Sequence, residues 1–202
     1  DSGQIVGLHI QLSGGALQGY RFRERAFDLV VRQTVEESIE SIVVAGIIVV
    51  YGDGGQIALC LSAGHKTVAN ILASKAFTVS MADATHVVAC DYVGIVSGHK
   101  EPDKFTKAGF HAVRSEFVNA PVIDELPMCV ECELVSYDPE SCHLVGRIIN
   151  VSADERILDE KGKIDPVKLR PITFDPVHND YLVLGEKVGN AFKDGSCLLY
   201  TS

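Results

Sequence analysis

Tryptophan is absent from the 202-residue chain, and methionine occurs only twice. Basic residues are also scarce, because 18 lysines and arginines stand against 27 aspartates and glutamates, giving a formal net charge of -9 at pH 7. Such a surface repels nucleic-acid phosphates, and no basic stripe interrupts it, so we expect no nucleic-acid partner. The longest apolar run, Ile42 to Tyr51, is too short to cross a bilayer as a helix. No charged-then-apolar leader opens the chain, and the sequence therefore predicts a soluble, cytoplasmic protein without a membrane anchor.

The hydrophobic content of 47% is enough for one globular domain with a real core. Cys60 and Cys90 stand in apolar runs, where a free cysteine acts as a small hydrophobe in a reducing compartment. Cys129 and Cys132 have the spacing of a redox or zinc pair, but they lie in an alternating, strand-like segment whose residues point to opposite faces three positions apart. We therefore predict no metal site. No order of Ser, His and Asp typical of a hydrolase is present, and no catalytic side chain is nominated.

Short apolar segments separated by turn signals dominate the chain, and they predict a mostly β fold with short helices. The run from 42 to 51 ends at Gly52-Asp53-Gly54-Gly55 and is followed by a second strand, which indicates a hairpin. Other predicted strands cover 76–81, 128–137 and 143–151, and predicted helices cover 20–33, 66–74 and 84–95, with a short one from 103 that Gly109 ends. Residues 113–127 are expected to be irregular, and Pro166, Pro171 and Pro176 to keep their segment extended. This order favours a closed or half-closed antiparallel β barrel.

The polar segment from Ser62 to Thr67 lies between a predicted strand and a predicted helix. A helix start exposes unpaired N–H groups and the positive end of the peptide dipoles, which stabilises an anion. Two hydroxyls, the Lys66 ammonium and the His65 imidazole lie at the same place, and this combination suits a phosphate monoester. An ordinary capped helix with Lys66 in solvent is the alternative that these residues leave open.

Several short sequence motifs follow one another between residues 56 and 194. They are LSAGHKT at 61–67, AFTVSMA at 76–82, DYVGIVSG at 91–98, DKF at 103–105, APVIDE at 120–125 and LGEKVGN at 184–190. In this order they resemble the flavin reductase-like, FMN-binding split-barrel family, and within it the flavoredoxin type. The resemblance implies a split β barrel that forms a homodimer with FMN at the interface.

The same resemblance assigns roles to the motif residues. It implies that Ser62, Lys66 and Thr67 bind the flavin phosphate, with His65 as a neighbour, and that Thr78, Ser80 and Ala82 line the edge of the isoalloxazine ring. Cross-strand pairing on a sheet surface is the alternative for Thr78 and Ser80. The implied activity is hydride transfer from NAD(P)H to flavin and on to a flavin, an iron centre or oxygen. An FMN electron carrier without a nicotinamide site and a flavin-free interaction module remain alternatives.

The resemblance has two gaps. Family members normally carry a ring-contact segment with an Asn and an Ala-Trp-type pair between the first two barrel strands, whereas this chain has no tryptophan and passes almost directly from Tyr51 to Gln56. Residues 1–41 match no part of the family and are left unassigned, with a divergent extension and an artefact as alternatives. Residues 196–202 resemble a translated sequencing adapter and are expected to be an artefactual tail. The predicted flavin reductase-like domain therefore covers residues 42–195.

Overall fold

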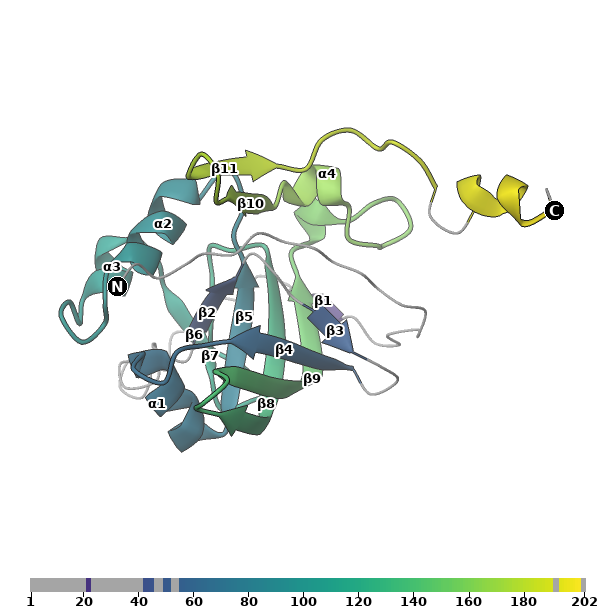
Figure 1. Ribbon diagram of the computed structural model, residues 1–202. Helices are drawn as coiled ribbons and strands as arrows, with labels where there is room; N and C mark the ends of the chain where they lie inside the picture. Colours follow the sequence, from purple (N-terminus) through teal and green to yellow (C-terminus); the bar gives the residue numbers. More distant parts are fainter. Residues whose placement is uncertain (1–20, 23–41, 46–48, 52–54, 191–192, 201–202) are drawn as a thin grey trace.

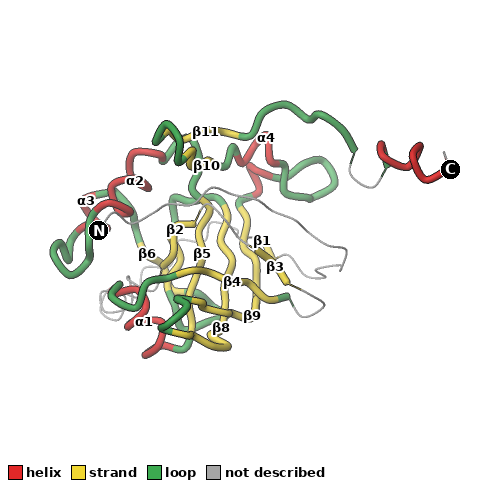
Figure 2. Tube along the Cα trace, viewed as in Figure 1, coloured by secondary structure: helices red, strands yellow, loops and turns green. Residues whose placement is uncertain are grey.

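A seven-stranded β sheet forms the centre of the computed structural model, which describes residues 21–22, 42–45, 49–51, 55–190 and 193–200 (Figure 1). The strands are β1 (Arg21–Phe22), β2 (Ile42–Ala45), β3 (Val49–Tyr51), β4 (Gln56–Cys60), β5 (Ala76–Met81), β6 (Ala112–Arg114), β7 (Pro121–Ile123), β8 (Met128–Asp138), β9 (His143–Ala153), β10 (Ile172–Asp175) and β11 (Asp180–Val183). The helices are α1 (Lys66–Ser74), α2 (Val87–Ile95), α3 (Lys104–Lys107) and α4 (Pro166–Leu169), with 3-10 turns η2 (Glu155–Ile157) and η3 (Asp194–Tyr200). Strands dominate and the helices lie at the periphery (Figure 2), which confirms the predicted mostly β fold with short helices.

The order of the strands requires the sheet to curl into a barrel. Neighbouring strands follow the order β2-β5-β8-β9-β4-β3, so β2 and β3 lie at opposite ends of this path. Five strand spacings in a flat sheet would separate these ends by about 24 Å. Because β2 ends at Ala45 and β3 begins at Val49, the connecting backbone reaches at most about 14 Å. The two ends of the path must therefore come towards each other, as in a barrel.

Strand β5 is buried along its whole length and on both faces. Phe77, Val79 and Met81 alternate into the barrel core, where they pack against apolar residues of β4, β8 and β9. The alternate residues Thr78 and Ser80 lie on the other face and are also completely buried. This double burial follows from the place of β5 between β2 and β8 and from β7, which contacts its outer face.

A buried carboxylate holds the β6–β7 hairpin against the outer face of the sheet. Glu131 of β8 is 1% exposed, and its oxygens accept hydrogen bonds from the Ser115 and Ser152 hydroxyls. The Asn150 amide donates a third bond at 2.8 Å. Because a buried charge is costly without partners, these donors are what allow Glu131 to lie under the hairpin.

Several predictions that rest on local sequence patterns are confirmed. Helix α1, strand β5 and the long β8–β9 hairpin lie where the sequence pattern predicts them. Helix α3 ends as expected before Gly109, whose φ of +78° suits glycine. The β3–β4 hairpin is confirmed as well.

The single strand predicted for residues 42–51 is wrong. Strand β2 pairs in parallel with β5, whereas β3 pairs antiparallel with β4, so the run supplies strands to both ends of the path. The helix predicted for 20–33 is wrong at Arg21–Phe22, which form β1 and pair in parallel with β9. The other residues of that prediction lie outside the described part of the chain.

Two further expectations are corrected by short elements. Residues 113–127 are not wholly irregular, because β6 and β7 pair antiparallel. Pro166 begins the one-turn helix α4, where its missing N–H costs nothing, and the Asp165 side chain caps this helix by accepting from the Val167 N–H. A proline can thus begin a helix as well as prevent one.

The predicted burial of cysteines holds for Cys90 and fails for Cys60. Cys90 is the fully buried residue of α2, and desolvation, with a smaller effect of Asp83, raises the pKa of its thiol to about 12. Cys60 is exposed because it shares the outward face of β4 with Gln56 and Ala58, whereas the alternate residues Ile57 and Leu59 are buried in the core. A continuous apolar run does not reveal which of its alternate residues face outward.

We predict that Gly146→Ala lowers the free energy of unfolding by about 1–3 kcal/mol, because a methyl group has no space there. A Cβ at Gly146 would lie 2.6 Å from Cε1 of the Phe77 ring and closer still to Cζ, and both ring atoms are part of the packed core. Urea unfolding followed by far-UV circular dichroism measures the change.

Gly185→Ala is the matched control, because a Cβ at Gly185 meets nothing within 4 Å. It should change stability by less than about 0.5 kcal/mol. Adding Phe77→Leu to Gly146→Ala should recover part of the loss relative to the sum of the two single changes. Equal stability of both glycine variants would contradict the close packing of Gly146 on Phe77.

Candidate flavin-binding site

The predicted phosphate loop lies between the end of β4 and the start of α1. Both backbone groups of Leu61 are held at this point: its N–H donates to the Cys142 carbonyl at 2.8 Å, and its carbonyl accepts from the Tyr137 hydroxyl at 2.8 Å. The His65 N–H then donates to the Ser62 carbonyl at 3.0 Å, which closes a turn. The β8–β9 hairpin and the turn that joins its strands thus anchor the residue directly before the loop.

The start of α1 carries no negative charge of its own. His65 is the N-cap residue in an extended conformation, but its side chain makes no capping hydrogen bond, and the first turn contains no acidic residue. Ser62 and His65 are exposed, and Lys66 and Thr67 are half-buried at the beginning of the helix. The positive end of the α1 dipole therefore faces an exposed loop that also supplies hydroxyl and ammonium donors, which is an arrangement suited to an anion.

The second group of predicted site residues lies on β5 and directly after it. Thr78 and Ser80 share the outer face of the strand, and Ala82 follows the strand in a second apolar cluster with Cys90 and Phe105. The Thr78 hydroxyl donates to the Pro121 carbonyl at 2.6 Å, so its proton is already used within the chain. The two groups belong to separate elements, and α1 joins the loop to β5.

Ser80 tests whether the β5 residues fit a bound ring. Its hydroxyl is completely buried and has no hydrogen-bond partner in the described part of the chain. An unpaired buried hydroxyl costs about 1–3 kcal/mol, so such a group in a folded protein calls for an explanation. A ligand with polar ring edges would supply the missing partner, and Ser80 therefore fits a flavin contact better than Thr78 does.

Asp91, the first residue of the motif at 91–98, has a hydrogen-bond partner within the chain. Its carboxylate accepts a hydrogen bond from the Tyr181 hydroxyl at 2.8 Å and so connects α2 to β11. Burial, followed by the bond to Asp91, raises the pKa of Tyr181 to about 12. This contact gives Asp91 a structural role, because it joins α2 to β11.

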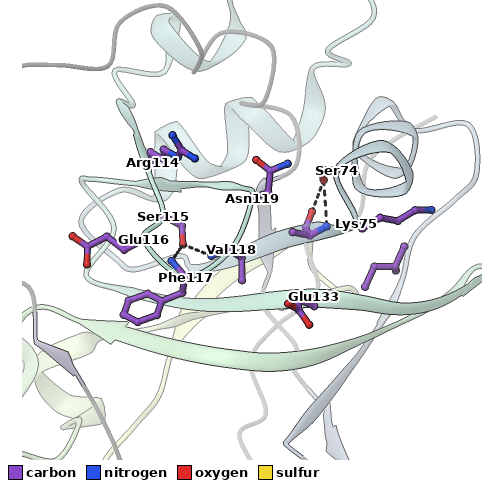
Figure 3. Close-up of a pocket in the computed structure, with 11 residues that line it drawn as sticks. Ser74, Lys75, Arg114, Ser115, Glu116, Phe117, Val118, Asn119 and Glu133 are labelled. Carbon is purple, nitrogen blue, oxygen red and sulfur yellow. Dashed lines mark hydrogen bonds between the residues drawn. The ribbon is translucent and has the colours of Figure 1, made fainter.

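A pocket that no sequence pattern predicts lies at the opposite end of α1 (Figure 3). Its volume is about 510 Å³, and its lining includes Ser74, Lys75, Arg114, Phe117 and Asn119. The two cationic side chains extend on different sides in Figure 3, so their charges do not converge on one point. The pocket is about one nine-residue helix, or roughly 14 Å, from the phosphate loop. Its residues come from three separate segments, which no local pattern connects.

The sequence did hold a signal for the Glu131 cluster. Glu131 stands between Val130 and Cys132 in the apolar part of a strand-like segment, where a carboxylate needs hydrogen-bond partners to be buried. Glu133, two positions later, has the same alternation but pairs with Arg147 at the surface, so the pattern does not tell which of the two is buried. The Glu131 partners Ser115 and Asn150 lie far away in sequence and could not be named.

Among the residues that the structure describes, no group of three or more His, Cys, Asp or Glu side chains is arranged to hold a metal ion. None of the described helices is both long enough and apolar enough to cross a membrane.

Comparison with known proteins gives matches among protein families and solved structures. The family model of the flavin reductase like domain matches residues 46–172. Flavoredoxin of Desulfovibrio vulgaris (Miyazaki F) is 36% identical with a TM-score of 0.65, over 69% of this chain and 75% of that one. Flavoredoxin from Methanosarcina acetivorans is 27% identical with a TM-score of 0.69, over 76% of this chain and 82% of that one. No curated protein matches the chain.

A more distant structure agrees in fold. The FMN-binding domain of a flavin reductases-like enzyme from Shewanella baltica OS155 is 16% identical, with a TM-score of 0.59 over 67% of this chain and 73% of that one. The fold and the family model support a flavin-related role in oxidoreduction or electron transfer. With the family model covering more than half of the chain, the protein belongs to the flavin reductase-like domain family and has its split-barrel fold.

Proposed function

We propose that this protein binds FMN and acts as an oxidoreductase that takes hydride from NAD(P)H and passes electrons to a further acceptor. One observation carries the proposal: the uncapped start of α1, which combines a free helix dipole with Ser62, Lys66 and Thr67. A phosphate monoester is the part of FMN that matches these donors.

The residues of the chain have separate roles in this proposal. Ser62 and Thr67 donate hydroxyl hydrogen bonds to phosphate oxygens, while Lys66 offsets their charge and His65 borders the loop. Ser80 gains a hydrogen-bond partner at the ring edge, and Ala82, which carries only a methyl group, allows the ring to approach the backbone. Bound FMN supplies the redox chemistry, so the protein has to bind, orient and shield it without a side-chain acid or base.

We also propose a homodimer in a reducing compartment such as the cytoplasm. Exposed apolar side chains are concentrated from β11 onward, at Leu182, Val183, Leu184 and Val188, and exposed apolar surface of this kind is typical of protein interfaces. All six cysteines are free, which is usual where glutathione and thioredoxin keep thiols reduced.

An FMN electron carrier without a nicotinamide site is the second candidate. Strands β3 and β4 pair directly, and only residues 52–55 connect them. This connection has no room for the ring-contact segment expected between the first two barrel strands, and the chain contains no tryptophan to replace it. A less enclosed ring favours electron exchange with protein partners over ordered binding of a nicotinamide.

We predict that Lys66→Ala combined with Thr67→Ala weakens FMN binding by about 10- to 100-fold, because charge-assisted hydrogen bonds to the phosphate are lost. Riboflavin has the same ring but no phosphate that these two side chains could contact, so the double substitution should change its affinity by less than about twofold. Fluorescence titration of the flavin-free protein measures both affinities.

Lys100→Ala with Thr106→Ala is the matched control, because both residues are exposed and lie away from α1. This control should bind FMN like the unchanged protein. Equal losses of FMN and riboflavin affinity in the α1 variant would contradict the phosphate assignment, and a protein that takes up neither flavin would overturn the proposed function.

Ser80→Ala should have opposite effects on the flavin-free protein and on flavin binding. Removal of an unpaired buried hydroxyl raises the free energy of unfolding of the flavin-free chain by about 1 kcal/mol, whereas loss of the proposed ring contact weakens FMN binding. Thr78→Val is the comparison, because it breaks the bond to the Pro121 carbonyl and should lower stability by about 1 kcal/mol. A Ser80→Ala variant that is destabilised and binds FMN normally would show that Ser80 has only a structural role.

Reduction without oxygen separates the two candidate functions. We expect NADH or NADPH to bleach the flavin absorbance of the FMN-loaded protein within a catalytic timescale, because hydride transfer reduces the ring. Dithionite is the control that shows full bleaching. If dithionite reduces the bound flavin and neither NADH nor NADPH does, the protein is the electron carrier.

A further inference from the structure

Two of the accessible cysteines lie together at the rim of the barrel, immediately before the phosphate loop. Cys60 is the last residue of β4 and its register partner in β9 is His143, the residue after Cys142. The backbone of the next residue, Leu61, donates to the Cys142 carbonyl at 2.8 Å. Cys60 is exposed and Cys142 is half-buried, so solvent reaches both thiols.

The backbone spacing suits a disulfide. Adjacent antiparallel strands lie about 4.8 Å apart with a rise of about 3.4 Å per residue, so residues offset by one position have Cα atoms about 6 Å apart. Disulfides are most common at a Cα separation of about 5.5–6 Å. Cys60 and Cys142 are related by this offset, because Cys142 faces Leu61.

Cys142 does not have the strand conformation that keeps a regular diagonal pair apart. Residues offset by one position on a regular ladder point to opposite faces. Cys142 has a φ of +60° and lies outside this alternation, at the last position of the turn that connects β8 to β9. Glycine adopts this conformation without cost, whereas any other residue is uncommon there. A strained cysteine at a turn position that suits glycine indicates a use for its side chain.

The surroundings place both thiols near one hydroxyl. Tyr137 donates to the Leu61 carbonyl, and its pKa is raised mainly by desolvation and further by Cys142, Asp138 and Cys60. The Cys142 thiol makes a weak contact of 3.9 Å with the Pro139 carbonyl, which rotation of the side chain breaks easily. Cys90, Cys129 and Cys132 are buried, and Cys197 lies in η3.

We propose that Cys60 and Cys142 form a reversible dithiol–disulfide site, with hydrogen peroxide as the oxidant. The two S–H groups give up two protons and two electrons as one S–S bond forms, and the peroxide O–O bond breaks to give two molecules of water. The bond ties the end of β4 to the β8–β9 turn, two residues before the Ser62–Thr67 loop. This inference does not rest on FMN binding or on the proposed reductase activity.

Thiol counting and peptide mapping of the full chain test the proposal. The reduced protein has six thiols, and we expect treatment with hydrogen peroxide to remove two of them and dithiothreitol to restore both. A tryptic digest without reductant should contain peptide 33–66, with Cys60, joined to peptide 115–147, and fragmentation should place the bond at Cys142. Non-reducing gel electrophoresis should show that the bond lies within one chain.

Three variants complete the test. Cys60→Ser and Cys142→Ser should each abolish the cross-linked peptide, and Cys197→Ser, which removes an exposed cysteine at another site, should retain it. Cys60→Ser changes only the exposed end of a strand, so it remains informative even where a change at Cys142 disturbs the turn. A bond to any other cysteine, cross-links only between chains, or no loss of thiols in the unchanged protein overturns the proposal.

Discussion

Closure of the barrel is the constraint on which the other features depend. The short connection between β2 and β3 forces the two ends of the strand path together, and this closes the sheet around the core that the inner face of β5 shares with β4, β8 and β9. A strand that is buried on both faces has little freedom to move. The polar residues on its outer face are therefore held rigidly, as residues that position a cofactor ring need to be.

The sequence predicted the elements whose partners are near in the chain. The β8–β9 hairpin and α1 follow from local alternation, helical spacing and turn residues, and the phosphate loop was found because it lies within one short segment. The division of residues 42–51 between β2 and β3 was not predictable, because the β2 partner, β5, lies more than thirty residues away and apolar residues suit either strand. For the same reason the Glu131 cluster and the pocket beside Arg114 required the folded structure.

Buried polar groups on the outer face of the sheet show three different solutions to desolvation. Glu131 is surrounded by donors, Thr78 donates to a backbone carbonyl of β7, and Ser80 has no partner among the described residues. The first two groups bind the β6–β7 hairpin to the barrel and contribute to stability. Ser80 makes no such hydrogen bond among the described residues, although it lies on the same face of β5 as Thr78 and only two residues away. This difference between the two residues is the reason to assign a ligand contact to β5.

The mixture of hairpin and parallel pairing also sets an order of assembly. Strands β8 and β9 are each eleven residues long and are joined by a four-residue turn, so their contacts form over short loops. The parallel pairs β2–β5 and β1–β9 close much longer loops and lose more chain entropy when they form. Folding of the barrel is thus expected to begin with the β8–β9 hairpin and to end with the pairing of β1 and β2. Sequence changes in β1 and β2 should therefore slow closure of the barrel without preventing the β8–β9 hairpin from forming.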